Sequence, residues 1–129
     1  MLISIEFSKK LKNTLTRLKP EQADLFIPRI EKFFEGLKKN QIIYFGDFIT
    51  ATGLDRKSTS ILLADLSFSS NPQIKPVTIP FADGKFWEPI KVDGLEFDPS
   101  AFEIYSEERE EFLTEKDIEL VAAYEVCND

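Results

Sequence analysis

The side chains that commonly carry out catalysis are scarce in this sequence. There is no histidine among the 129 residues, which removes the commonest general base and a usual zinc ligand. The single cysteine, Cys127, lies near the end of the chain with no imidazole to activate it, and it cannot form an intramolecular disulfide. The five glycines are scattered singly, so no glycine-rich phosphate loop is present. The sequence therefore predicts a protein that is not an enzyme and has no cofactor or metal site.

Carboxylates are the remaining candidates for chemistry, and their excess lies near the C-terminus. Residues 103–129 contain 2 Lys and Arg against 10 Asp and Glu, whereas residues 1–102 contain 14 against 13. We interpret the glutamates of this acidic segment as exposed, solvated side chains rather than a metal or acid–base site. They include Glu107, Glu108, Glu110 and Glu111. Two other interpretations stay open: the segment binds a basic partner, or it covers the protein's own basic surface.

A turn followed by a helix is predicted over residues 53–66. Gly53 can adopt the left-handed conformation that ends one short helix and turns the chain into the next. Asp55 can then cap a helix over residues 55–66. Helical spacing predicts a buried stripe of Thr59, Leu62, Leu63 and Leu66. The opposite face carries Lys57, Ile61, Ala64 and Phe68, and this outer face is therefore unusually apolar.

Three explanations of the apolar outer face stay open. Its side chains can pack under another segment of the same chain, contact a protein partner, or contact DNA directly. Trp87 can likewise be interpreted in two ways: it packs in the core, or it forms part of an interface. The candidates for protein binding are Ile61, Ala64, Phe68 and Trp87.

The elements that position these residues belong to one predicted domain, residues 1–129. Hydrophobic residues make up 43% of the chain, which is enough for a packed core. No run approaches the ~20 apolar residues that span a bilayer, and "MLISIEFSKKLKN" lacks the apolar core of a secretion signal. We expect a cytoplasmic protein that does not bind membranes.

The first 40 residues predict one strand and two helices. Alternating apolar residues in "LISIEF" predict a strand over residues 2–7. Ser8 can cap a helix that ends before Pro20. A second helix is expected to begin around Pro28, and Asn40 can turn the chain after it.

A β-hairpin is predicted around Asp83-Gly84, which is a strong turn pair. This turn sets the register of two cross-strand pairs: Phe81 opposite Phe86, and Val77 opposite Ile90. Prolines cannot donate a hydrogen bond to a ladder, so both strands are expected to lie at a sheet edge. The prolines concerned are Pro76, Pro80 and Pro89.

The end of the chain predicts a last helix that packs on the core. Thr114 and Asp117 have the spacing of a capping box. Apolar residues then recur at helical spacing from Ile118 onward. The acidic C-terminal extension, residues 103–129, is therefore predicted to contain a helix that begins at this capping box.

A helix, a helix-turn-helix and a two-stranded hairpin follow one another in this chain, and this order resembles the winged helix superfamily. The resemblance covers about residues 28–92. "FITATGLDRKSTSILLADL" is similar to the helix-turn-helix pattern through Gly53, Leu54 and Leu62. The expected fold class is α+β: a winged helix-turn-helix domain with a β-hairpin wing and an acidic C-terminal helical segment.

The resemblance implies that residues 55–66 form a recognition helix, which enters the major groove in members that bind DNA. The hairpin would then reach the flanking backbone. The DNA contacts implied in this way are Arg56, Lys57, Ser58 and Ser60 on the helix, with Lys75, Lys85 and Lys91 on the wing. This set contains few cations for a DNA-binding surface.

Two functions are consistent with these residues. The first is an adaptor or regulatory subunit that binds a protein partner within a multi-protein system acting on nucleic acid. The second is a sequence-specific DNA-binding regulator, which we would expect to be a homodimer. Loss of binding on changing Arg56 and Lys57 would indicate DNA, whereas dependence on Ile61, Phe68 or Trp87 would indicate a protein interface.

Overall fold

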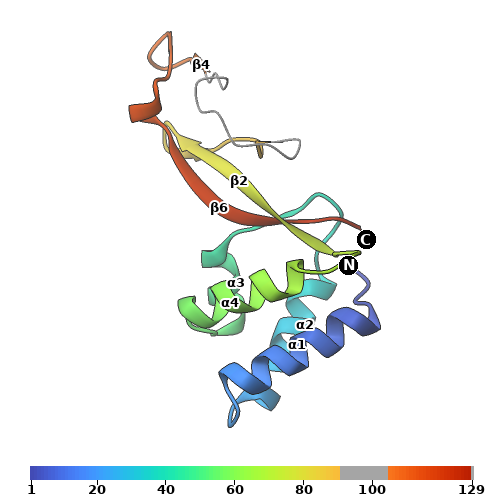
Figure 1. The fold of residues 1–129 in the computed structure, drawn as a ribbon. Coiled ribbons are helices and arrows are strands. Elements are labelled where there is room, and N and C mark those ends of the chain that lie inside the picture. Colours follow the sequence, from blue (N-terminus) through green and yellow to red (C-terminus); the bar gives the residue numbers. More distant parts are fainter. Residues whose placement is uncertain (91–104, 129) are drawn as a thin grey trace. The chain divides into compact units, whose positions relative to one another are not determined.

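The structure, a computed structural model, describes residues 1–90 and 105–128 (Figure 1). These residues form a mixed α+β structure with four α-helices and antiparallel strands. The helices are α1 (Ile5–Leu18), α2 (Ala23–Glu35), α3 (Phe45–Thr52) and α4 (Arg56–Ser67). The strands are β1 (Ile42–Ile43), β2 (Ile74–Ala82), β3 (Lys85–Phe86), β4 (Tyr105–Ser106), β5 (Glu111–Phe112) and β6 (Glu119–Val126). A 3₁₀ helix, η2 (Glu115–Asp117), precedes β6.

The chain divides into two compact units. The first unit comprises Met1–Pro76 and Ala123–Asp129, and the second comprises Val77–Ala122. The first unit contains the four helices and β1. Strands β2 and β6 each begin in one unit and end in the other.

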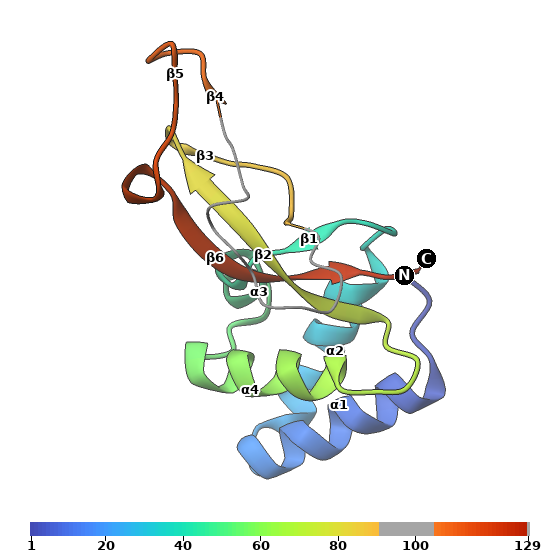
Figure 2. The same ribbon diagram turned by 45° about the horizontal axis from the view of Figure 1, so that its top comes forward.

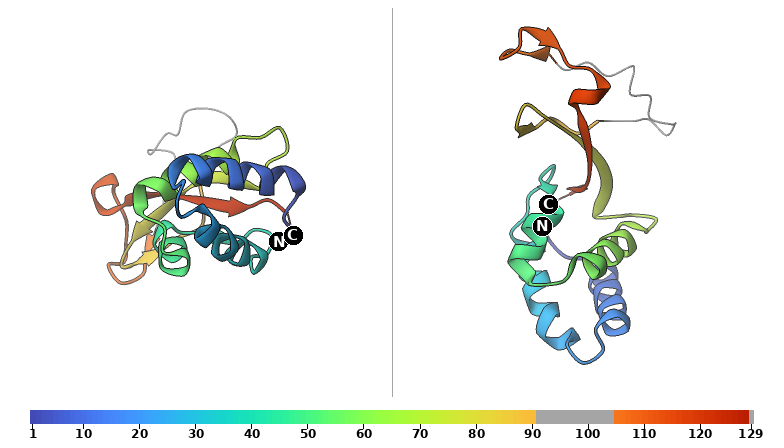
Figure 3. Two further views of the ribbon diagram at one scale, coloured as in Figure 1. Left: turned by 90° about the horizontal axis from the view of Figure 1, so that it is seen from below. Right: turned by 90° about the vertical axis from the view of Figure 1, so that its left-hand side faces the viewer.

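The core of the first unit lies between the four helices. Helix α1 packs against α2 and α4, and α3 packs against the same two helices (Figure 3). The rings of Phe7 and Phe34 meet edge to face, with their centroids 5.0 Å apart. Phe33 and Phe48 make a similar contact at 5.1 Å, so aromatic pairs tie α1, α2 and α3 together.

The predicted N-terminal strand is wrong, because helix α1 begins at Ile5. Ser4 is its N-cap, and the side chain of Ser4 accepts a hydrogen bond from the amide of Phe7 at 3.1 Å. Ser8, the predicted cap, lies inside the helix. The buried residues Phe7, Leu11 and Leu15 have a spacing of four, which outweighs the short alternation at residues 2–7.

Helix α2 begins earlier than predicted, at Ala23 rather than around Pro28. Pro28 lies inside the helix and lacks the N–H that would complete the backbone ladder there. Phe26, Ile30 and Phe34 are buried along one face of α2, and their packing stabilises the helix on both sides of Pro28. Asn40 has a φ of 70°, so the predicted turn after the helix is confirmed at this residue.

The larger sheet has the strand order β1-β6-β2-β3 (Figure 2). Strand β2 is therefore an inner strand, and the prediction that it lies at an edge is wrong. The carbonyl of Pro80 accepts the amide of Trp87, so even-numbered residues of β2 direct their backbone groups toward β3. Pro76 and Pro80 lack a backbone N–H group, and both prolines lie at even-numbered positions that face β3. Because β3 is a short strand, few backbone hydrogen bonds are lost there.

The predicted hairpin turn is confirmed. Asp83 and Gly84 have φ values of 53° and 73°, as a two-residue turn of type I′ requires. Phe81 pairs with Phe86, as predicted. The partner of Ile90 is Thr78 rather than Val77, because the returning segment contains one extra residue between the two pairs.

The predicted C-terminal helix is wrong, because residues 119–126 form strand β6. Tyr124 pairs with Ile43 and Glu125 with Ile42 of β1. Thr114 and Asp117 do form the predicted capping box, but it caps the single turn of η2. The acidic C-terminal segment is therefore not helical over its final part; it supplies a strand of the main sheet.

Candidate recognition surface

The turn between α3 and α4 is built from local contacts. Gly53 ends α3 with a φ of 77°, so the predicted left-handed conformation is confirmed. The hydroxyl of Thr52 donates to the carbonyl of Phe48 at 2.8 Å and accepts the amide of Leu54 at 3.3 Å. A polar side chain is thereby satisfied at a buried position of the turn.

The predicted N-cap of α4 is also confirmed. The carboxylate of Asp55 accepts the amide of Ser58 at 3.0 Å and pairs with the ammonium of Lys19 at 2.9 Å. The hydrogen bond from Lys19, together with those from Ser58, holds the pKa of Asp55 far below its usual range. This carboxylate fixes the start of α4 relative to the end of α1.

Helix α4 has one fully buried side. Thr59, Leu62 and Leu63 are completely inaccessible to solvent, and Leu66 is nearly so. The predicted buried stripe is therefore confirmed at all four positions. Ser58 joins this side at 6% exposure, so this candidate DNA contact lies in the interior of the first unit.

The opposite side of α4, the outer face, is exposed. We define it by Arg56, Lys57, Ser60, Ile61, Ala64 and the C-cap residue Phe68. Phe68 is 83% exposed and Ile61 38% exposed. The described part of the chain therefore leaves most of Phe68 and more than a third of Ile61 accessible to solvent. The structure places five predicted site residues on this side of α4, and a sixth, Phe68, directly follows the last residue of the helix.

Phe68 makes its contacts with the first half of α1. The ammonium of Lys10 lies 5.8 Å from the centroid of the Phe68 ring and hydrogen-bonds to the Phe68 carbonyl. The hydroxyl of Ser69 donates to Glu6 at 2.9 Å. These contacts fix the backbone around Phe68, while most of the ring stays accessible.

The basic residues predicted for the wing have different surroundings. Lys75 lies in the first unit, 3.7 Å from the carboxylate of Glu125. Lys85 lies in the second unit, with its ammonium 4.3 Å from the centroid of the Trp87 ring. Lys91 lies outside the described residues. Each described wing lysine thus already has an intramolecular partner.

Trp87 belongs to the small core of the second unit. Trp87 packs against the buried residues Ala82 and Leu113, as Ile118 also does, and it is half-buried. The indole N–H donates to the carbonyl of Ala82 at 3.0 Å. These contacts favour the explanation of Trp87 as a core residue.

The acidic segment contains a feature that the sequence analysis did not single out. Strands β4 and β5 form a hairpin whose loop and second strand contain the clustered glutamates. Tyr105 pairs with Phe112 across the hairpin, and both rings are exposed. The available signal was an aromatic residue on each side of the glutamate run, at the spacing of a short hairpin.

Cys127 and the carboxylates are the side chains that remain as candidates for chemistry. Burial raises the pKa of the Cys127 thiol, which opposes formation of a nucleophilic thiolate. Its amide donates to the carbonyl of Gln73 at 2.8 Å, so the segment at Cys127 is tied to the first unit rather than frayed. Within residues 1–90 and 105–128, no group of three or more acidic or cysteine side chains could hold a metal ion.

Comparison with known proteins yields no relative for this chain. No family model matches it, and no curated protein or solved structure matches it. Among the described helices, none combines the length and apolar character that crossing a membrane requires.

Proposed function

We propose that this protein is a non-enzymatic recognition module of the winged helix type, whose outer face of α4 binds a protein partner. The observation that carries the proposal is the exposure of Phe68 and Ile61 on a helix whose other side is fully buried. Aromatic residues, Phe among them, are enriched in the cores of protein interfaces, and a few buried anchors supply most of the binding energy there. By analogy with its fold type, we place the protein as an adaptor or regulatory subunit in a multi-protein system acting on nucleic acid.

The order of the elements supports the winged helix part of the proposal. Helix α2 and strand β1 precede the α3-turn-α4 pair, and β2 and β6 then form neighbouring strands of the sheet. On this assignment the wing strands are β2 and β6. Residues 83–118 then separate the two wing strands in the sequence, whereas the resemblance predicted a wing formed by the hairpin around Asp83-Gly84 alone.

DNA binding is the alternative, and the N-terminal end of the outer face favours it. Arg56, Lys57 and Ser60 are exposed, and within the described residues neither cation forms an ion pair. The first unit contains 12 Lys and Arg against 10 Asp and Glu. Because phosphate contacts supply most non-specific affinity, this small surplus makes DNA the second choice.

Two double variants of the full-length chain separate the alternatives. Arg56→Ala with Lys57→Ala removes the cations of the outer face, and Ile61→Ser with Phe68→Ser removes its apolar anchors. Leu25→Ser is a matched control for the second pair, since Leu25 is 52% exposed on α2. Removing the acidic segment is not a suitable test, because it would also remove β6.

The measurements are DNA binding and partner capture. Binding to mixed-sequence duplex DNA is measured at low and moderate salt, and partners are captured from the source cells and quantified by mass spectrometry. The proposal expects a partner that wild type and Leu25→Ser retain and that Ile61→Ser with Phe68→Ser loses. Salt-dependent DNA binding that only Arg56→Ala with Lys57→Ala abolishes would replace the proposal with the DNA-binding alternative.

A further inference from the structure

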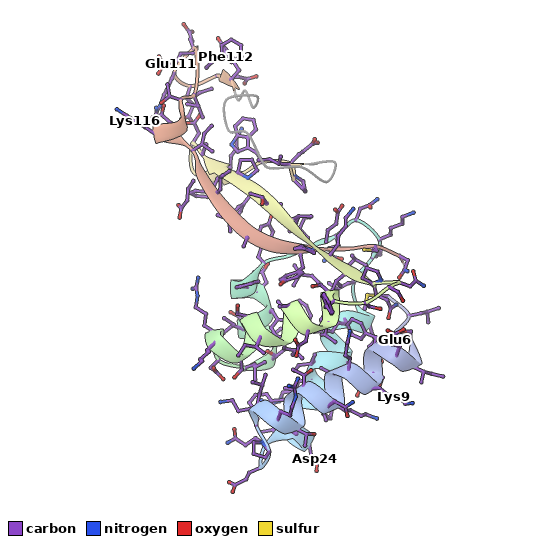
Figure 4. All side chains as sticks on the ribbon, in the orientation of Figure 1. Glu6, Lys9, Asp24, Glu111, Phe112 and Lys116 are labelled. Carbon is purple, nitrogen blue, oxygen red and sulfur yellow. The ribbon has the colours of Figure 1, made fainter. Side chains whose placement is uncertain are left out.

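The second unit presents a pair of aromatic side chains on its β4–β5 hairpin, and Figure 4 labels one of them, Phe112. Tyr105 and Phe112 lie directly opposite each other, and their rings meet edge to face at a centroid distance of 5.3 Å. Tyr105 is 46% exposed and Phe112 61% exposed. We call this pair the aromatic hairpin face. Exposed, contiguous apolar surface is a common feature of interaction sites.

Neighbouring residues show that the hairpin is held in place. Ser106, on the other side of the strand from Tyr105, is buried, and its hydroxyl accepts the amide of Arg109 at 3.2 Å. The guanidinium of Arg109 donates to Asp117 at 2.9 Å and lies 3.8 Å from Asp83. The loop is thereby attached to η2 and to the β2–β3 turn. Little ordering entropy is then lost when a partner binds the two rings.

The surroundings of the aromatic hairpin face are strongly acidic. Its loop and β5 expose four carboxylates: Glu107, Glu108, Glu110 and Glu111. Arg109 is the single cation between residues 105 and 112, and it is already bound to carboxylates of the same unit. The second unit as a whole contains 4 Lys and Arg against 13 Asp and Glu. Unlike the outer face of α4, this surface carries no unpaired cation among its described residues.

We propose that the aromatic hairpin face binds a basic segment of another protein. An Arg or Lys of that segment would lie on the exposed rings through a cation–π contact, with its aliphatic stem against them. Neighbouring cations would pair with the glutamates of the loop, so the charges of the two surfaces are complementary. The same charge repels nucleic acid, which excludes DNA and RNA as the occupant.

The test uses the full-length chain and a defined probe. The probe is a fluorescent twelve-residue peptide of alternating Arg and Leu, and a Glu and Leu peptide of equal length serves as the control. Fluorescence anisotropy gives the dissociation constant. Two variants address the site: Phe112→Ser, and the triple change Glu107→Gln, Glu108→Gln and Glu110→Gln. The matched control has the same change in net charge on exposed residues of the first unit: Glu21→Gln, Asp24→Asn and Glu35→Gln.

We expect the Arg peptide alone to bind, and both site variants to weaken it by about tenfold. The triple control should change the affinity by less than about twofold, because its charges lie outside the site. Equal weakening by the two triple variants would show that binding follows total charge, and would overturn the proposal. Failure of the Arg peptide to bind would also overturn it. Ile61→Ser with Phe68→Ser should leave peptide binding unchanged, so this result is independent of the function proposed for α4.

Discussion

Thr59 is a buried residue whose hydroxyl has no hydrogen-bond partner among the described residues. A buried, unsatisfied hydroxyl costs free energy, and valine has the same shape without this group. We expect Thr59→Val to raise the free energy of unfolding by about 1 kcal/mol. Urea unfolding followed by circular dichroism measures the change.

Thr14 is the matched control for Thr59. It is equally buried, but its hydroxyl hydrogen-bonds to Asp65 at 3.2 Å. The corresponding Thr14→Val change should lower the free energy of unfolding by about 1 kcal/mol. If both variants are destabilised, Thr59 has a polar partner and the reasoning from burial fails.

The Asp55 carboxylate makes a pH-dependent contribution to stability. Its pKa is lowered in the folded state, chiefly by Lys19, whereas in the unfolded chain it is about 3.9. Its contribution is thus complete above about pH 4 and is lost as the pH falls toward the folded pKa. We expect Asp55→Ala to cost about 1 kcal/mol at pH 7 and less at pH 3. Urea midpoints at the two pH values measure this.

Asp24 provides the comparison for Asp55. It is an exposed residue of the first turn of α2, and Asp24→Ala removes the same charge there. The stability difference between the two variants should shrink on going from pH 7 to pH 3. A difference that stays constant would show that the ionised form of Asp55 is not what stabilises α4.

At the scale of the elements, two glycines differ in the backbone conformation that they require. Gly84 has a φ of 73° in the β2–β3 turn, where an L-residue is strained. Gly46 lies in helix α3, and an added Cβ would meet no atom within 4 Å. We expect Gly84→Ala to lower the free energy of unfolding by about 1–2 kcal/mol, and Gly46→Ala to raise it by up to about 1 kcal/mol. Thermal unfolding of both variants checks the two signs, and a stabilised Gly84→Ala would contradict the turn assignment.

Elements whose signals are local could be predicted from the sequence. The turn at Gly53, the cap at Asp55 and the turn at Asp83-Gly84 depend on residues within a few positions of one another. The structure confirms all of them. The buried side of α4 was also predictable, because four residues at helical spacing share one face.

The ends of the chain could not be predicted, because their partners are distant in sequence. Residues 119–126 have helical spacing, but their backbone completes a ladder with Ile42 and Ile43. The alternation of apolar residues at the N-terminus predicted a strand, but these residues form the start of α1. Ser4 caps this helix, and Phe7 belongs to a buried helical stripe that continues along it. The candidate site could be predicted in part. Helical spacing identified the outer face of α4. The aromatic hairpin face could not be predicted, because it depends on the pairing of Tyr105 with Phe112 across a hairpin.

At the scale of the whole molecule, the two units have different charges. Most of the acidic excess near the C-terminus belongs to the second unit, which has 13 acidic against 4 basic residues. The first unit is almost balanced, with 12 basic against 10 acidic residues. This division suits a protein with two recognition surfaces, of which one accepts a mainly apolar partner and the other a basic one. The two proposals can therefore be tested with separate variants.

The prediction of a single domain can be tested by unfolding, because each unit has its own spectroscopic probe. Trp87, the only tryptophan, reports on the second unit by fluorescence, and the four described α-helices report on the first by far-ultraviolet circular dichroism. Since β2 and β6 each contribute residues to both units, we expect the two probes to give the same urea midpoint. Leu113→Ala in the second unit, at a cost of about 2–3 kcal/mol, should then shift both midpoints equally. If the variant moves only the Trp87 signal, the units unfold separately and the chain contains two domains.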